Sequence, residues 1–175
     1  LVGSEMCIRD SSSLQLRARE GPLHLGELRR ADRNASRIRA LRSCPGSLYW
    51  RDQGHPWGGM HSSAPDLAIL LQTVLNGGTY GEAEVFSPAA CRTMTQNRNR
   101  HLDAPWGLGW ALRDSKVWSF FGEITSPSTF GHVGATGTVA WADPERDLIC
   151  VVLTNQLDGS LLRRISNAVF ASVEE

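Results

Sequence analysis

The feature that most constrains the fold of this 175-residue chain is a run of six consecutive apolar residues at 148–153. The segment 138–142 precedes it and is joined to it through Asp143-Pro144-Glu145-Arg146, a sequence typical of a tight turn. The two segments therefore predict a β-hairpin. Because the second arm has no polar side to expose, we expect helices to cover both faces of its sheet.

Two serines mark the starts of predicted helices upstream of this hairpin. In 63–66 a cap hydroxyl is followed by a proline in the first turn and by an acid near the positive end of the helix dipole. This helix continues through apolar residues at helical spacing and ends at 76–78, where two glycines allow a left-handed conformation. Ser87-Pro88 repeats the start signal and predicts a second helix towards Asn97.

Further elements are predicted on both sides of these segments. Residues 106–110 indicate a strand whose glycines permit close backbone approach. Residues 160–173 place their apolar side chains along one stripe, which predicts an amphipathic C-terminal helix. The Arg- and Leu-rich segment 14–42 fits two short helices or a structured loop equally well.

Composition and charge exclude two classes of partner. The sequence is 41% hydrophobic and 21% charged, and 18 basic residues balance 18 acidic ones, which is typical of a globular domain. A net charge of zero provides no field that would attract nucleic acid. The longest apolar runs, 67–71 and 148–153, are far shorter than the roughly 18 to 20 residues that span a bilayer. We expect no nucleic-acid partner and no membrane span.

Residues that commonly bind metals or form redox sites are not grouped in the sequence. The four cysteines lie far apart, so no C-x-x-C pair exists. His55 and His61 lack the i,i+4 helical spacing and the nearby carboxylates of a zinc site. We therefore expect no metal and no cofactor.

The start of the chain differs from the rest. Its first residue is leucine, and the peptide LVGSEMCIRDS resembles the translation of a sequencing adaptor. We expect residues 1–12 to be an artefactual or disordered tail and leave them out of the fold argument. We also expect the natural protein to have a longer front than this sequence shows.

The segment 130–138, FGHVGATGT, is the best candidate for a functional site. Three glycines, a histidine and two threonines at the start of a strand let backbone donors approach a ligand closely. A glycine-rich bend with a capping histidine explains the same residues without any function. A phosphate cradle fits less well, because the spacing is G-x-x-G-x-x-G and no G-K-[ST] occurs in the chain.

The order of these motifs resembles the C-terminal half of the β-lactamase-related serine hydrolases, which include class C β-lactamases, DD-peptidases and related esterases. The resemblance rests on GGMHSSAPDLAILLQTVLNGG, SPAACRTM, WGLGW, FGHVGATGT and WADPERDLICVVLTNQ, in that order. It implies an α+β fold, with an antiparallel sheet flanked by helices beside a helical domain. It assigns residues 13–100 to part of the helical domain and its connecting loops, and 101–175 to the C-terminal strands and helix of the α/β domain.

In this family a serine of S-x-x-K attacks the acyl carbon, while its lysine and the tyrosine of Y-x-N move protons. A third motif, K-T-G or H-x-G, faces them from a strand, and 132–134 matches it. The resemblance implies that His132 orients the substrate and assists proton transfer, and that Gly134 leaves room for the substrate. It also implies that the Ala135 N–H donates to the developing oxyanion. Trp57 and Thr136 are expected to contact the substrate.

The third motif also bears on the substrate class. Near neutral pH a histidine carries its positive charge less completely than a lysine does. His132 therefore captures a substrate carboxylate less strongly than the lysine of K-T-G. We expect a small-molecule or peptide acyl substrate, with esters and other small acyl compounds favoured.

Two of the three catalytic motifs do not occur in these 175 residues. Lys116 is the only lysine, and Arg113 stands three positions before it, so S-x-x-K is missing. Neither Tyr49 nor Tyr80 begins a Y-x-N. We expect the chain to be part of a serine hydrolase that cleaves an ester or amide through an acyl-enzyme, and to be inactive alone. The alternatives are a non-catalytic relative that binds peptidoglycan-like or acyl ligands, and a free-standing structural domain.

Overall fold

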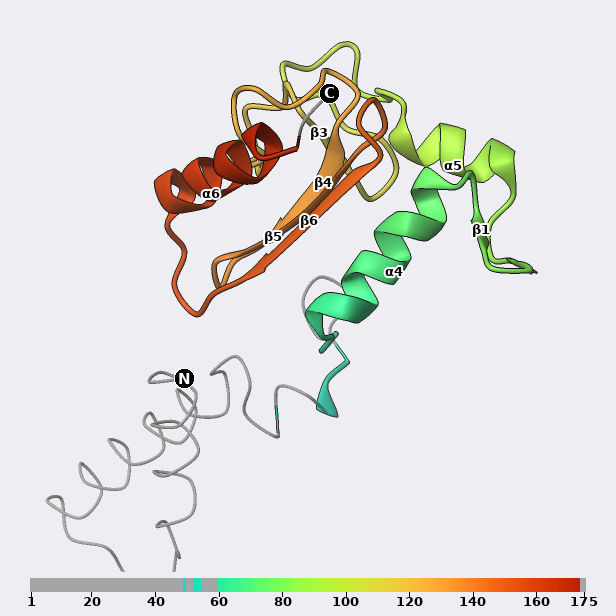
Figure 1. Ribbon diagram of the computed structural model, residues 1–175, viewed down its shortest axis with the longest axis horizontal. Coiled ribbons are helices and arrows are strands. Elements are labelled where there is room, and N and C mark those ends of the chain that lie inside the picture. The colour runs from blue at the N-terminus through green and yellow to red at the C-terminus, as the bar shows by residue number, and fades with distance from the viewer. Residues whose placement is uncertain (1–48, 50–51, 55–59, 174–175) are drawn as a thin grey trace, which may run out of the picture. The chain divides into compact units, whose positions relative to one another are not determined.

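The computed structural model describes residues 49, 52–54 and 60–173 (Figure 1). The predictions for 1–12 and 14–42, and the assignment of Trp57, concern residues outside this part of the chain. All named elements lie in one compact unit, Ser62–Glu175. In chain order they are α4 (Ala64–Leu75), β1 (Thr79–Tyr80), β2 (Ala83–Glu84), α5 (Pro88–Thr95), β3 (Ala111–Leu112), β4 (Phe130–Gly134), β5 (Thr138–Asp143), β6 (Leu148–Leu153) and α6 (Gly159–Ala171).

The main sheet of this unit is antiparallel, with the strand order β3-β4-β5-β6. Its registers pair His132 with Ala140 and Trp141 with Cys150. The hairpin predicted from 138–142 and 148–153 is confirmed as β5 and β6. The short strands β1 and β2 form a separate two-stranded sheet.

Both helices that were predicted from serine caps are confirmed. The Ser63 Oγ accepts a hydrogen bond from the Asp66 N–H at 3.3 Å, and the Ser87 Oγ accepts one from the Ala90 N–H at 3.2 Å. Each cap satisfies a backbone donor that the first turn of a helix leaves without a partner. A proline in the first turn completes both start signals.

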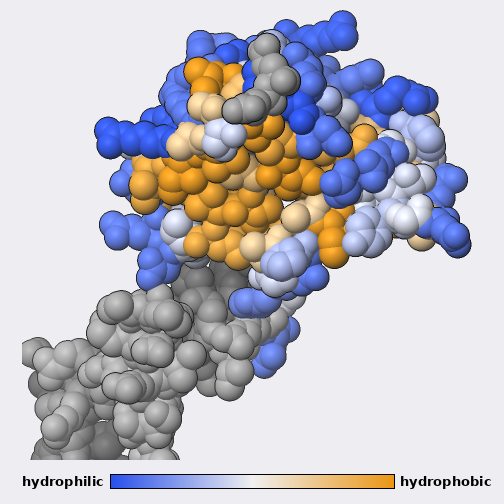
Figure 2. All heavy atoms as spheres, viewed as in Figure 1, coloured by the Kyte–Doolittle hydropathy of each residue, from blue (hydrophilic) through white to orange (hydrophobic). Residues whose placement is uncertain are grey.

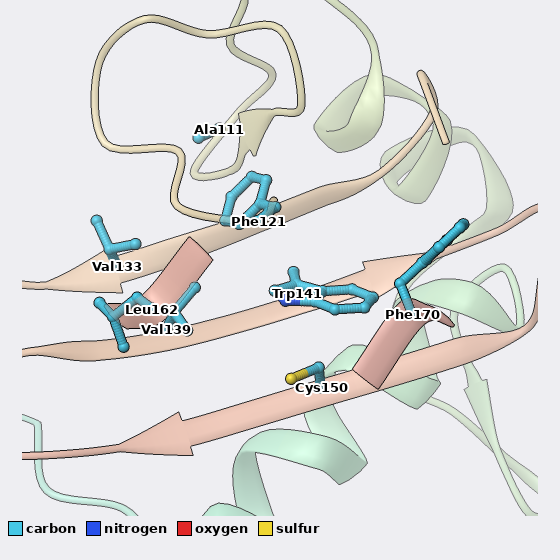
Figure 3. Close-up of a cluster of buried hydrophobic side chains, with 8 residues drawn as sticks. All are labelled: Ala111, Phe121, Val133, Val139, Trp141, Cys150, Leu162 and Phe170. Atoms are coloured by element: carbon cyan, nitrogen blue, oxygen red, sulfur yellow. The ribbon is translucent and has the colours of Figure 1, made fainter. Parts of the chain in front are cut away.

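One face of the sheet packs against α6, the predicted C-terminal helix. Figure 3 shows the buried cluster there, in which Trp141 and Phe121 lie with side chains from the strands and from α6. The indole of Trp141 donates a hydrogen bond to Ser166 Oγ at 2.9 Å, and Ser166 donates to the Phe120 carbonyl at 3.1 Å. These two bonds fix α6 to β5 and to the loop that precedes β4.

The other face packs against α4. Leu71 and Val74 of this helix form a second buried cluster with Phe130, Ala142 and the indole of Trp110. Helices therefore cover the two faces of the sheet, as the unbroken apolar run of β6 predicted. An α+β fold with an antiparallel sheet flanked by helices is confirmed. The assignment of 13–100 to a helical domain stays a prediction.

The strand predicted at 106–110 is wrong. The structure has an isolated bridge between Trp106 and Ala111, and the strand β3 begins only at Ala111. The segment is instead an irregular loop. Its backbone passes so close to Met94 that a Cβ at Gly107 would lie 1.7 Å from the Met94 carbonyl oxygen. Gly109 has a φ of +82°, which extended strand geometry does not allow.

The outer surface of the unit is not uniformly polar. Figure 2 shows apolar side chains gathered in the middle of one face, with hydrophilic side chains around them.

Among the described residues, no helix has the length and apolar character needed to cross a bilayer.

Candidate active site

Strand β4 presents His132 at the surface of the sheet. Side chains alternate along a strand, so His132 shares a face with Phe130, while Val133 points to the opposite face. Phe130 is buried in the apolar cluster that packs against α4 (the α4 cluster), and Val133 is buried in the one that packs against α6 (the α6 cluster). His132, in contrast, is exposed. The two apolar neighbours thus hold the strand in place while the imidazole stays accessible.

The contacts of the imidazole determine which of its nitrogens is available. The Nδ1 atom lies 2.7 Å from the Val133 carbonyl oxygen. A carbonyl oxygen can only accept a hydrogen bond, so we assign the proton of the neutral ring to Nδ1. The Nε2 atom then carries the lone pair, and it can accept a hydrogen bond or a proton from a bound molecule.

A second ring touches the imidazole. The indole of Trp106 meets it nearly edge-on, with the ring centroids 5.4 Å apart and the planes at 85°. This separation and angle are those that aromatic pairs prefer. In the sequence, Trp106 was only the first residue of the predicted strand 106–110 and of the motif WGLGW, and nothing there indicated its contact with His132.

The turn that follows β4 carries the other predicted residues. The Gly137 N–H donates to the Gly134 carbonyl at 3.0 Å, and Gly137 has a φ of +91°. This is the pattern of a three-residue hairpin loop that ends in a left-handed glycine. Ala135 and Thr136 occupy the exposed part of the loop. Within the described residues, the Ala135 N–H makes no hydrogen bond, so it is open to an acceptor on a ligand.

The chain that follows β6 holds this turn in place through hydrogen bonds and close packing. Thr154 binds the Gly137 carbonyl through both its backbone N–H, at 3.2 Å, and its hydroxyl group. A Cβ at Gly137 would lie 2.0 Å from the Gln156 carbonyl oxygen, so the two segments are in direct contact. The amide of Ala135 is therefore carried by a well-supported turn.

Gly134 has a packing role that the sequence did not reveal. An added Cβ at this position would lie 2.3 Å from the Thr138 Oγ1, its partner across the hairpin. Any larger residue would therefore displace Thr138 or the turn. The expected role of Gly134, space for a substrate, is separate from this one and stays a prediction.

The described cysteines and the lysine are poor candidates for a nucleophile. Burial raises the pKa of Cys150 to about 11 and also raises that of Cys91, so both thiols are protonated near neutral pH. Lys116 is exposed and forms an ion pair with Asp103. In the described part of the chain, no three His, Cys, Asp or Glu side chains are grouped to hold a metal ion.

The fold is that of the β-lactamase/transpeptidase type. The sequence profile of the family described as "Beta-lactamase" matches residues 8–171. The chain therefore belongs to the beta-lactamase family, whose members are serine hydrolases.

The relatives agree with this assignment. Proteins named "Putative D-alanyl-D-alanine carboxypeptidase" are 39% identical over 104 residues in Escherichia coli O157:H7 and 37% identical over 110 residues in Salmonella gallinarum. These matches cover 59% and 61% of this chain, and 23% and 25% of the relatives. The chain thus spans about a quarter of the length of these relatives.

Solved structures give the same picture. A beta-lactamase from Mycobacterium bovis is 32% identical, with a TM-score of 0.54, and the match covers 63% of this chain and 44% of that one. A penicillin-binding protein homolog from Caulobacter crescentus is 24% identical, with a TM-score of 0.50, over 68% of this chain and 38% of that one. The second likeness concerns the fold alone.

Proposed function

We propose that this chain is part of a serine hydrolase that cleaves an ester or amide through an acyl-enzyme, and that His132 and Ala135 belong to its active site. The observation that carries the proposal is the geometry at the end of β4. An accessible imidazole with its lone pair on Nε2 stands three residues before an exposed backbone N–H with no partner among the described residues.

The two groups have different roles in the proposed reaction. When a serine oxygen attacks the acyl carbon, the carbonyl oxygen becomes negatively charged. The Ala135 N–H donates a hydrogen bond to this oxyanion, together with the N–H of the nucleophile itself. The Nε2 of His132 orients the substrate and accepts a proton as the acyl-enzyme forms or breaks down. Thr136 and Trp57 are proposed to contact the substrate.

The attacking serine of this proposal does not come from these 175 residues. Their only lysine, Lys116, is exposed and paired with Asp103, and it is preceded at the third position by Arg113. The S-x-x-K and Y-x-N groups would have to be supplied by further sequence. We therefore propose that the 175-residue chain is inactive by itself.

Two considerations bear on the substrate. Relatives named as carboxypeptidases support a peptide amide that ends in D-alanine. Against this, a histidine in place of the lysine of K-T-G weakens the attraction for a terminal carboxylate. We propose a small acyl compound as the substrate and favour an ester over a carboxylate-bearing peptide.

The test uses the longer gene product that contains this sequence, beside the 175-residue chain. Each is incubated with p-nitrophenyl butyrate, nitrocefin and an N-acylated D-alanyl-D-alanine peptide, and acyl adducts are sought by mass spectrometry. The longer protein should form an adduct and turn over the ester fastest, and the 175-residue chain should form none. Saturable ligand binding by the longer protein without any adduct would overturn the proposal in favour of a non-catalytic binder.

The role of His132 is tested by substitution. His132→Ala in the longer protein should lower kcat by about 100- to 10,000-fold, the usual contribution of a proton-transferring side chain. The matched control is His101→Ala, which removes an exposed histidine from the loop between α5 and β3. Equal rates for the two variants would remove His132 from the mechanism.

A further inference from the structure

We infer that Trp106, held in place by Ser115, is a positioning residue that fixes the orientation and the tautomer of His132. The inference rests on the proposed function for its catalytic meaning, but its structural content can be measured without activity. It starts from the contact between the two rings, whose centroids are 5.4 Å apart and whose planes cross at 85°.

Trp106 is anchored both through its indole and through its backbone. The indole N–H donates to Ser115 Oγ at 3.0 Å. The carbonyl oxygen of Trp106 accepts from the Arg98 N–H at 2.6 Å, and the Trp106 backbone forms a bridge with Ala111, the first residue of β3. The ring therefore has a defined position before it meets the imidazole.

Ser115 is itself held in one orientation. It is 4% exposed, and its hydroxyl donates to the Val117 carbonyl at 2.8 Å. The same oxygen accepts from the Val117 N–H at 3.2 Å and from the Trp106 indole. Because the hydroxyl proton is committed to Val117, the oxygen presents a lone pair to the indole. Ser115 thus fixes which way the indole faces.

The imidazole needs such support. Among the described residues the imidazole makes one hydrogen bond, from Nδ1 to the carbonyl of the adjacent Val133. An exposed ring can exchange such a bond for water by rotating about its side-chain torsions. The Trp106 ring blocks one side of that rotation. Keeping Nδ1 on the Val133 carbonyl keeps the proton on Nδ1 and the lone pair on Nε2.

The first test measures the tautomer directly. The 175-residue chain is labelled with 15N-histidine, and two-bond proton–nitrogen correlations are recorded at alkaline pH, where imidazoles are neutral. His132 should be protonated on Nδ1. Trp106→Leu should move both ring nitrogens towards the averaged shifts of the exposed His101, and Ser115→Ala should move them in the same direction by less. Trp118→Leu, which removes an exposed indole outside this contact, should leave the His132 shifts unchanged.

Two additions keep the test decisive if Trp106→Leu does not fold. Trp106→Phe retains an aromatic ring but loses the bond to Ser115, so it should give a partial change in the tautomer. In the unaltered chain, a nuclear Overhauser effect should connect the indole and imidazole protons. Absence of that effect, or a His132 tautomer that is unchanged in every folded Trp106 and Ser115 variant, overturns the inference.

Kinetics in the longer gene product then connect positioning to catalysis. A displaced catalytic group slows the chemical step more than it weakens binding, so Trp106→Leu should lower kcat by about 10- to 100-fold with KM within about twofold. If the protein hydrolyses nothing but the tautomer changes as expected, the proposed function fails and the positioning stands. If His132→Ala abolishes hydrolysis but Trp106→Leu changes neither tautomer nor kcat, only the positioning fails.

Discussion

Asp143 is a carboxylate with 0% of its surface exposed, and four donors surround it. Its Oδ2 accepts from the Ser126 N–H and the Thr129 hydroxyl, each at 2.8 Å. Its Oδ1 accepts from the N–H groups of Glu145, at 3.0 Å, and Arg146, at 3.3 Å. One side chain thus joins the β5–β6 turn to the segment that leads into β4, the strand that carries the candidate site.

These contacts predict how stability depends on pH. Burial acts to raise the pKa of Asp143, but the hydrogen bonds outweigh it and hold the pKa below its usual value. The folded-state pKa is thus lower than the unfolded one, near 3.9. The stabilisation from this carboxylate is therefore complete above about pH 4 and is lost as the pH falls through the folded-state value.

Asp143→Asn replaces acceptor lone pairs by an NH2 group that faces donors. We expect a loss of about 1 to 3 kcal/mol in the free energy of unfolding at pH 7, measured by urea denaturation. The loss should shrink as the pH approaches the folded-state pKa, where the native carboxyl is protonated too. Asp147→Asn is the control, since Asp147 is exposed in the same turn and asparagine tolerates its φ of +47°. Equal losses for both variants, or a loss that does not vary with pH, would contradict this account.

The sequence identified the turn at 143–146 but not the burial of its aspartate. A turn is recognised from adjacent residues. The Thr129 hydroxyl and the Ser126 N–H, which make Asp143 a structural centre, are 14 and 17 positions away in the sequence. The same reason separates His132, which a local motif singled out, from Trp106 and Ser115, whose contacts with it arise only when the chain folds.

At the scale of elements, local signals predicted helices and the hairpin well. Serine caps located α4 and α5, and the unbroken apolar run located β6, because each signal lies within the element that it defines. The failure at 106–110 has a non-local cause. Gly107 is needed where the backbone passes the Met94 carbonyl, and no pattern within five residues shows that contact.

The β4–β5 hairpin predicts a coupling between Gly134 and Thr138. A methyl group at Gly134 would lie 2.3 Å from Thr138 Oγ1, so Gly134→Ala should destabilise the chain by about 1 to 3 kcal/mol, as overpacking does. Thr138→Ala removes the obstructing oxygen. The cost of Gly134→Ala in that background should fall by at least about half, which a double-mutant cycle by thermal or urea unfolding would measure.

Additive costs in that cycle would contradict this account, because the cost of Gly134→Ala would then not come from the Thr138 hydroxyl group. A cost that falls in the Thr138→Ala background would identify the clash as a folding constraint on position 134 that does not depend on a substrate.

At the scale of the whole unit, the sheet lies between two separate apolar clusters. The α4 cluster and the α6 cluster have no buried residue in common, yet both draw on the same strands. Because β4 contributes Phe130 to one cluster and Val133 to the other, loss of either layer removes support from the strand that presents His132. The candidate site therefore depends on both layers at once.

This arrangement predicts a single cooperative unfolding transition. Leu71 of α4 is 1% exposed and Leu162 of α6 is 0% exposed, so truncation of either to alanine should cost about 2 to 5 kcal/mol. Both variants should lower the midpoint of the same transition, followed by circular dichroism and by tryptophan fluorescence, because the sheet cannot persist with one face stripped. Their costs should add, since the leucines share no cluster. Leu161→Ala, at a position 45% exposed in α6, should have little effect. Two separate transitions, one sensitive to each leucine, would show that the layers fold independently and that strand β4 does not unite them.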